Sequence, residues 1–230
     1  MTLWPISIHD RRLPAIAQRA WPATHTEPAE PLFLADWYQV LMLHYEVEPS
    51  ALQRAVPFPL DLHDGEAFVT LVAFTMRGMR PRFGGRLGRW LFASIASHPF
   101  LNVRTYVRHS GEHGIYFMTE WLPNRISVAL GPRFFGLPYR LGQLEYRHPT
   151  VRAGSAGIPA GEFALQGRVA EFVRGTFAYT GRVTCGTERG DCEPGSLTEW
   201  LMERYTAFTC ARGKARFFRV WHPPWKQSDG

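Results

Sequence analysis

The sequence predicts a mainly β, β-rich α+β single domain with a few small peripheral helices. Its 230 residues are a common size for an undivided β-barrel, and its composition is that of an ordinary globular protein with a sizeable core. Aromatic residues are frequent, with sixteen Phe and eight Trp, and such side chains suit half-buried pleated surfaces. Strand-like runs recur along most of the chain, whereas helical periodicity is confined to short segments.

The first half of the chain is dominated by strand-like runs. Residues 33–47 (FLADWYQVLMLHYEV) favour a long strand, although their pattern alone leaves a helix open. Residues 49–57 carry a Pro at each end and a short apolar stripe, which predicts a helix of about two turns. Residues 66–79 indicate a strand buried on both faces. The Gly- and Arg-rich residues 80–98 are expected to form a long mobile connection.

The second half begins with a hairpin and continues in strands. Residues 101–109 and 114–121 are two strand-like runs around a tight turn, followed by a short helix and a Pro-containing turn before residue 141. Three further strands are expected between residues 141 and 185. Ser196 with Glu199 forms a capping box that predicts an amphipathic helix over 197–208, and a last strand follows from Lys214.

The predicted domain organisation is an irregular N-terminal arm over residues 1–31 and one domain over 32–230. The arm is interrupted by prolines and has no sustained period. Residues 1–30 have no continuous apolar segment of the kind found in signal peptides, and no stretch approaches the roughly 20 apolar residues of a membrane span. We therefore expect a cytoplasmic protein without a membrane partner.

The positive charge of the chain comes almost entirely from arginine. The net charge is +6 with a pI of about 9.5, and the only lysines are Lys214 and Lys226. The arginines are densest over 77–89, which leaves nucleic-acid binding through this segment as an alternative. No nucleic-acid motif accompanies them, so a solvated surface is the preferred interpretation.

No metal, cofactor or disulfide is predicted. Three cysteines, Cys185, Cys192 and Cys210, include no CxxC pair. His109 and His113 flank a turn and do not share a helix face, so their spacing does not predict a metal site.

Several motifs occur together in a recognisable order. They are EPSALQRAVPFPLDLHDGEAFVTLVAF, LNVRTYV, GIYFMTEWLPNRISVALGPRFFGLPYRLG, GSLTEWLMERYTAFT and HPPW. Read together, they resemble acetoacetate decarboxylase and the YqjF-like proteins, an uncharacterised bacterial family with which we associate the same fold. The resemblance covers roughly residues 32–226. It implies a closed antiparallel β-barrel or cone around a central apolar cavity.

The chain departs from the decarboxylase at the turn that carries its catalytic lysines. There, one lysine forms a Schiff base and its neighbour depresses the pKa of the first. The corresponding turn here reads Pro138-Tyr139-Arg140-Leu141-Gly142, and neither side chain can form an imine. Tyr139 and Arg140 are nevertheless the candidate catalytic positions, as a proton donor and an electrostatic clamp. The pattern of the family also favours a glutamate where this chain has Phe100.

The candidate ligand-binding residues are Asn102, Arg104 and Tyr106. They alternate along one predicted strand and therefore share a face, which can point either into the cavity or outward. The family resemblance favours the inward direction, where a guanidinium would bind a carboxylate.

The resulting functional hypothesis is a protein that binds a small anionic or carbonyl-bearing organic ligand. Whether it is an enzyme stays open; an enzyme of this kind would be a lyase or isomerase acting on an oxo acid without a Schiff base. The alternative is a non-catalytic binding or sensing module. Homo-oligomerisation also stays open.

Overall fold

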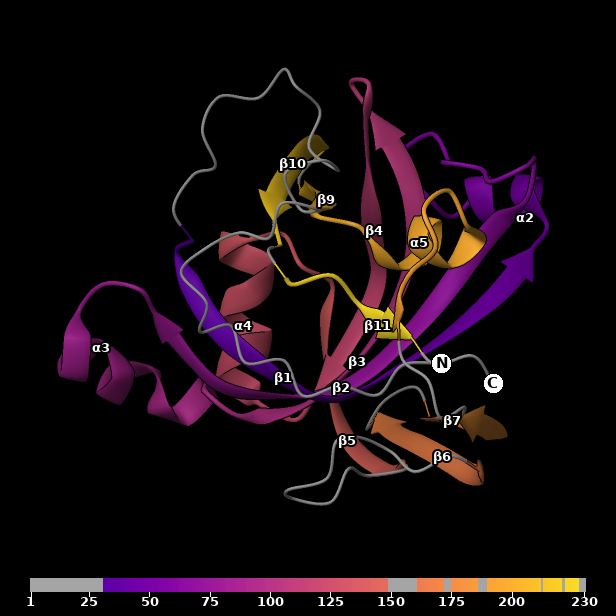
Figure 1. Cartoon of the computed structure of the whole chain (residues 1–230). Coiled ribbons are helices and arrows are strands. Elements are labelled where there is room, and N and C mark those ends of the chain that lie inside the picture. The colour runs from indigo at the N-terminus through magenta and orange to yellow at the C-terminus, as the bar shows by residue number, and fades with distance from the viewer. Residues whose placement is uncertain are drawn as a thin grey trace.

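The computed structural model describes residues 31–148, 161–171, 175–185, 190–211, 213–220 and 222–227. The predicted N-terminal arm lies outside these residues except for Pro31. The described part is mainly β, and its large sheet curls into a half-barrel (Figure 1). No helix in this part is both long and apolar enough to cross a membrane.

The first four strands form an antiparallel meander in chain order, β1-β2-β3-β4. Their bounds are β1 Phe33–Val47, β2 Ala67–Pro81, β3 His98–His109 and β4 Glu112–Leu122. The predicted strands at 33–47, 66–79, 101–109 and 114–121 are therefore present. Ser110 and Gly111 both have positive φ angles (52° and 80°), as a tight hairpin turn between β3 and β4 requires.

The sheet divides at β4, which has two parallel partners on its second edge. Residues 115–116 pair with β9, and residues 120–122 pair with β5. One branch continues as β5-β6-β7 and the other as β9-β10, all joined by antiparallel pairs, and a small separate sheet pairs β8 with β11. The bounds are β5 Tyr139–Arg147, β6 Gly161–Glu171, β7 Gly175–Cys185, β8 Gly190–Asp191, β9 Thr206–Ala211, β10 Lys214–Arg219 and β11 Lys226–Gln227.

This division is the main difference from the simple closed antiparallel barrel that the sequence suggests. The strands run β1 to β7 along one curled path, and within the described residues β1 and β7 do not pair with each other. The two branches leave β4 at different positions along the strand, β9 at residues 115–116 and β5 at residues 120–122.

In three short helices, the side chain of the residue just before the helix accepts hydrogen bonds from the first backbone amides, which stabilises the start of the helix. In α2 (Pro49–Gln53), the Glu48 carboxylate accepts hydrogen bonds from the amides of Ser50 and Ala51. The caps of α4 (Arg125–Phe134) and α5 (Leu197–Met202) are Asn124 and Ser196. One half of the predicted capping box is present, because Ser196 Oγ accepts from the Glu199 amide, but the Glu199 carboxylate accepts from the Gly195 amide and not from that of Ser196.

Two predictions at helix and turn boundaries are wrong. The helix that begins at Ser196 ends at Met202 rather than at 208, because residues from Thr206 join β9 instead. The predicted turn at 138–142 is the start of β5, where Tyr139 pairs with Glu120.

The segment 80–98 is also not the long connection that its composition suggested. It contains α3 (Gly85–Phe92) and a 3₁₀ turn, η1 (Ala93–Ile95), which stand out from the sheet at one end of the molecule (Figure 1). Gly84 precedes α3 with a φ of 97°, a left-handed conformation that glycine adopts without strain. Gly85 also has a positive φ, of 51°, so the backbone turns sharply at these two glycines where the helix begins.

The sheet is buried on both faces along β2, as predicted for residues 66–79. Val72 and Phe74 pack into the cluster around the cavity, whereas Leu71 and Ala73 pack into a second cluster under the β5-β6-β7 branch. The alternation of side chains along a strand divides one apolar run between the two cores.

Candidate functional site

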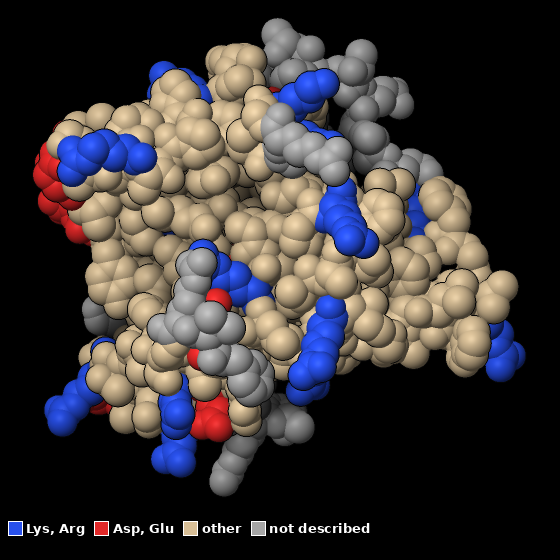
Figure 2. All heavy atoms as spheres, turned by 180° about the vertical axis from the view of Figure 1, so that it is seen from behind, with Lys and Arg blue, Asp and Glu red and all other residues tan. Residues whose placement is uncertain are grey.

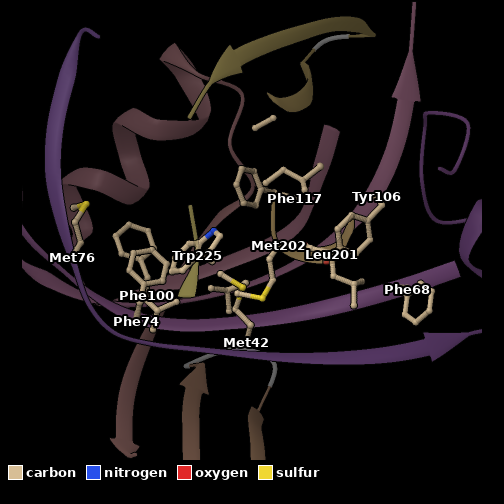
Figure 3. Close-up of a cluster of buried hydrophobic side chains, with 14 of the residues drawn as sticks. Met42, Phe68, Phe74, Met76, Phe100, Tyr106, Phe117, Leu201, Met202 and Trp225 are labelled. Carbon is tan, nitrogen blue, oxygen red and sulfur yellow. Dashed lines mark hydrogen bonds between the residues drawn. The ribbon is translucent and has the colours of Figure 1, made fainter. Parts of the chain in front are cut away.

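A cavity of about 140 Å³ lies between one face of β1-β2-β3-β4 and the segments that cover this face, which are the start of β5, the residues around Arg204, and the C-terminal residues from Phe218 to Trp225 that the structure describes. Most of its wall is aromatic or aliphatic. Phe74 and Phe100 stack with ring centroids 5.2 Å apart, and Trp37 stacks on Phe74 at 4.5 Å. Figure 3 shows Phe74, Phe100 and Trp225 gathered on one side of this cluster, with Phe117 projecting from β4. The polar side chains in the wall are Asn102, Arg104, Glu120, Tyr139, Arg204 and His222.

Strand β3 supplies Asn102 and Arg104, which are 4% and 6% exposed. Both line the cavity because residues two apart on a strand share a face. Tyr106 lies on the same face and is buried, but it is outside the cavity wall. Its hydroxyl donates to the carbonyl of Leu201 at 2.9 Å.

Glu120 reaches the cavity through a β-bulge in β4. Val103 pairs with Thr119, but Arg104 pairs with Phe117, so Met118 is the extra residue. A bulge reverses the alternation of faces beyond it. Phe117 and Glu120 therefore both face the cavity, whereas regular alternation from Phe117 would place Thr119 there.

Asn102, Glu120 and Tyr139 form a row across three adjacent strands. Asn102 is paired with Glu120 in the β3–β4 register, and Glu120 with Tyr139 in the β4–β5 register. The Tyr139 ring packs against Gly131 of α4, where a Cβ atom would lie 2.3 Å from the ring. Gly131 thus makes room for the tyrosine in this row.

Glu120 is a protonated acid at neutral pH. Burial raises its pKa to about 8, and its Oε1 atom has no hydrogen-bond partner within the described residues. Burial, and then the charge that Glu120 would carry, raise the pKa of Tyr139 well above its ordinary value. The row therefore presents two neutral groups that can donate a proton in a hydrogen bond.

Arg104 is buried without an acidic partner in the described part of the chain. The contact of its Nη2 atom is with Met42 Sδ at 3.7 Å, a weak acceptor, and its Nε atom has no partner. The Oδ1 atom of Asn102, two residues away on the same face, is also unpaired. Buried polar atoms are usually satisfied, so such a set indicates a place for a ligand or bound water.

Arg204, in contrast, is anchored on several sides. Its Nη1 atom donates to Asp61 Oδ2 at 3.0 Å, its Nε atom donates to the carbonyl of Trp200 at 2.7 Å, and the guanidinium lies 4.3 Å from the Trp200 ring centroid. Only Nη2 is left without a partner. One donor of this buried cation is therefore available to a ligand.

Asp61 is the counter-ion of Arg204 and its carboxylate is fully buried. Burial alone would raise the pKa of Asp61, but the hydrogen bond from His113, the charge of Arg204 and the hydrogen bond from Arg108 together outweigh this effect and lower the pKa. Asp61 is therefore ionised and fixes the orientation of Arg204.

His222 completes the polar part of the wall. Burial lowers its pKa to about 4, so the imidazole is neutral at pH 7. Its Nδ1 atom lies 2.9 Å from the Pro223 carbonyl, and its ring stacks on Tyr205.

The structure brings together three of the five sequence-predicted site residues. Asn102, Arg104 and Tyr139 line the cavity. Tyr106 does not line it, but the Tyr106 ring contacts Arg204, whose guanidinium lies 5.3 Å from the ring centroid. Arg140 points to the other side of β5. Its side chain is 37% exposed and lies 3.9 Å from Glu171, so it is not placed as a clamp on a cavity ligand.

Sequence analysis missed Glu120, Arg204 and His222. The bulge that turns Glu120 inward has no recognisable sequence signal, and Arg204 was assigned to a helix that ends before it. Within the described residues, no group of three or more His, Cys, Asp or Glu could hold a metal ion.

Comparison with solved structures shows which fold the chain has. The chain superposes on the enduracididine biosynthesis enzyme MppR, solved with the condensation product of pyruvate and imidazole 4-carboxaldehyde, with a TM-score of 0.53 and 17% identity over 86% of this chain and 68% of MppR. It also matches an acetoacetate decarboxylase-like enzyme from Sphingomonas wittichii RW1, with a TM-score of 0.49 and 18% identity over 77% and 63% of the two chains. The predicted acetoacetate decarboxylase-like fold class is confirmed.

Comparison by sequence identifies the family. Residues 34–229 match the model of the family DUF2071, described as an uncharacterized conserved protein, and the chain belongs to this family. The uncharacterized protein YqjF of Bacillus subtilis (strain 168) is 29% identical over 191 residues, which are 82% of this chain and 72% of YqjF. The resemblance to YqjF-like proteins is therefore confirmed.

Proposed function

We propose that the cavity binds a small organic acid that carries a carboxylate and a carbonyl oxygen. The observation that supports this most directly is a set of four unpartnered buried polar atoms around one apolar cavity. They are Asn102 Oδ1, Arg104 Nε, Glu120 Oε1 and Arg204 Nη2. Leaving such groups unsatisfied costs roughly 1–3 kcal/mol each. A ligand that pairs with them recovers this free energy.

The cavity has a cationic part and a neutral part, so the two ends of the ligand would carry different polar groups. The cationic end, with Arg104 and Arg204, suits a carboxylate. The row of Asn102, Glu120 and Tyr139 offers neutral donors that suit a carbonyl oxygen. Residues two apart on a strand are separated by about 6.8 Å, so the row lies one side-chain spacing from Arg104. The aromatic wall would enclose the carbon chain between the two ends.

Protonated Glu120 could act as a general acid toward a ligand in the cavity. When a bond beside a carbonyl breaks, negative charge develops on the carbonyl oxygen, and donors placed there stabilise it. Glu120 and Tyr139 can donate to that oxygen, and Glu120 can transfer its proton because its pKa lies near neutrality. This supports a non-Schiff-base lyase or isomerase activity on an oxo acid. The solved MppR complexes contain pyruvate or its condensation product, which agrees with this ligand class.

An imine mechanism receives no support from the side chains around the cavity. The wall contains no lysine among the described residues, and Lys214 is exposed on β10. We expect no borohydride-trappable adduct with acetoacetate, as measured by the intact mass after reduction. A stable adduct on Lys214 would contradict this part of the proposal.

Calorimetric titration tests the binding itself. Pyruvate, acetoacetate and levulinate place the carbonyl at increasing distances from the carboxylate, and acetone lacks the carboxylate. We expect binding of at least one acid and none of acetone. Arg104→Met should weaken binding about tenfold to a hundredfold, since a charged hydrogen bond contributes about 1.5–3 kcal/mol. Arg140→Met is the matched control and should leave affinity unchanged; equal affinities in all three proteins would refute the site.

The second candidate function is a non-catalytic binding or sensing module, which would use the same cavity. Deuterium exchange separates the two. If the site is catalytic, the ionised fraction of Glu120 should take a proton from the carbon beside the carbonyl of the bound acid and return a deuteron from solvent, so that deuterium enters the acid. Glu120→Gln should abolish this exchange while retaining binding. Binding without exchange in the wild type would favour the module.

A further inference from the structure

Large apolar side chains are concentrated on a surface at the α3 end of the molecule, which we call the α3–α4 face. Trp90 is 73% exposed, and Leu87 and Leu91 beside it on α3 are 66% and 60% exposed. Leu32, Phe83 and Phe134 are exposed to a similar extent, 67%, 64% and 67%. Single exposed apolar residues are normal, but a group of this kind indicates an interaction surface.

Contacts between rings and one hydrogen bond join the segments that carry these side chains. The Phe33 ring, at the start of β1, lies 5.6 Å from Phe92 at the end of α3 and 6.0 Å from Phe135 beyond α4. Asn124, which caps α4, donates to the carbonyl of Ser94 in η1. Three segments distant in the sequence therefore meet at this end of the molecule.

The charges on the α3–α4 face are positive. Arg86 and Arg89 on α3, and Arg125 and Arg133 on α4, are exposed and make no ion pair within the described part of the chain. Residues 67–111 and 121–144 contain no Asp or Glu. The nearest acidic residue in the strand register is Asp36, opposite Arg77. Figure 2 shows this end, on its right, in tan and blue, whereas most of the red side chains lie toward the opposite end.

We propose that the α3–α4 face docks on an anionic lipid surface. A short helix that presents Trp and Leu together with Arg is suited to the boundary between headgroups and acyl chains, where the apolar tips insert and the guanidinium groups stay among the phosphates. Helix α3 projects from the sheet, so it can reach such a surface without unfolding (Figure 1). The expectation of no membrane partner rested on the absence of a spanning segment, and surface docking does not need one.

A second copy of the chain fits this face less well. In a two-fold dimer the same patch meets itself, so the arginines of one copy would oppose those of the other. Head-to-tail stacking on the acidic end would join opposite ends of the molecule and would produce an open chain of subunits rather than a closed assembly.

Vesicle co-sedimentation tests the proposal with the full-length protein. The vesicles contain phosphatidylcholine alone or with about one third phosphatidylglycerol. We expect binding to the anionic vesicles that is at least tenfold tighter than to the neutral ones and that weakens at about 0.5 M salt. Arg86→Gln/Arg89→Gln should weaken it about tenfold. Leu87→Ser/Trp90→Ser should have a similar or larger effect because it removes the inserted side chains.

The matched controls lie at the opposite end of the molecule. Tyr45→Ser/Leu62→Ser removes apolar residues that are 46% and 41% exposed, and Arg54→Gln removes an exposed cation. Both should bind as the wild type does. All substituted side chains are exposed, and circular dichroism verifies that each variant is folded.

Three outcomes would overturn the proposal. The first is equal binding by the wild type and by both α3 variants, or binding by none. The second is an assembly, measured by light scattering, whose mass falls in Leu87→Ser/Trp90→Ser, which would assign the face to a second copy. The third is binding to polyglutamate as tight as to the anionic vesicles, which would assign it to an acidic protein partner.

Discussion

Arg104 and Arg204 are both buried in the wall of one cavity, but they are held in different ways. Arg204 has a carboxylate, a backbone carbonyl and an indole ring around its guanidinium. Arg104 has a thioether contact and no acidic partner in the described residues. A buried charge normally requires a partner. The comparison therefore suggests that Arg204 is a structural cation with one spare donor, whereas Arg104 receives its counter-ion from the ligand.

The largest effect should come from removing the anchored arginine. Arg204→Met leaves the buried carboxylate of Asp61 without its closest buried partner, and breaking such a pair typically costs 3–5 kcal/mol. Urea denaturation should show this loss of unfolding free energy. Arg108→Met is the control, because Arg108 contacts the same carboxylate with a side chain that is 53% exposed, and it should cost much less. If the two variants lost the same unfolding free energy, the buried Arg204 would be no more important to Asp61 than the half-exposed Arg108.

Glu120 should make the stability of the protein fall as the pH rises from 4.5 to 8. Its folded pKa of about 8 is above its ordinary value of 4.5, so its contribution to stability is complete below pH 4.5 and is lost as the pH rises toward 8. Glu120→Gln should therefore be increasingly stable relative to the wild type as the pH rises through this window, by up to about 1.4 kcal/mol per pH unit.

Urea denaturation of both proteins at pH 5 and pH 8 measures this difference. The comparison is needed because His44 and His222 act in the opposite direction. Burial lowers their pKa values to about 3 and 4, so their contribution is lost as the pH falls below 6.5. If the wild type and Glu120→Gln showed parallel pH profiles, Glu120 would not be a buried neutral acid.

Removing the unpaired arginine should affect binding more than folding. Arg104→Met replaces an unpaired buried charge with an apolar side chain of similar length, so the free energy of unfolding without ligand should stay the same or rise. Affinity for an acidic ligand should fall about tenfold to a hundredfold. Titration and denaturation of the same preparation measure both quantities. A large loss of stability would show that Arg104 has a structural partner and would end the contrast with Arg204.

The smallest effect is expected at Arg140, which the sequence had placed in the site. Its contact with Glu171 is 3.9 Å long and partly exposed, and such pairs contribute about 0–1 kcal/mol. Arg140→Ala should therefore leave ligand affinity unchanged and alter stability by no more than this. A loss of binding would mean that Arg140 reaches the cavity in the bound state.

The sequence by itself determined the features that depend on local patterns. The alternation along residues 101–109 placed Asn102, Arg104 and Tyr106 on one face, and the apolar run at 66–79 predicted a strand between two cores. These two conclusions require only the identity and spacing of residues within one segment. The fold was predicted from the resemblance of several motifs to a known family, and the same resemblance led us to expect Tyr139 and Arg140 in place of the catalytic lysines.

The tertiary structure decided what depends on pairing between segments. The extra residue Met118 exists only in the register of β3 against β4, and it alone turns Glu120 into the cavity. Arg204 is fixed by Asp61, a residue 143 positions away. Which of Tyr139 and Arg140 faces the cavity depends on the parallel pairing of β5 with β4. Long-range register and counter-ion contacts have no local signal, because they arise from side chains that meet only when the sheet has formed.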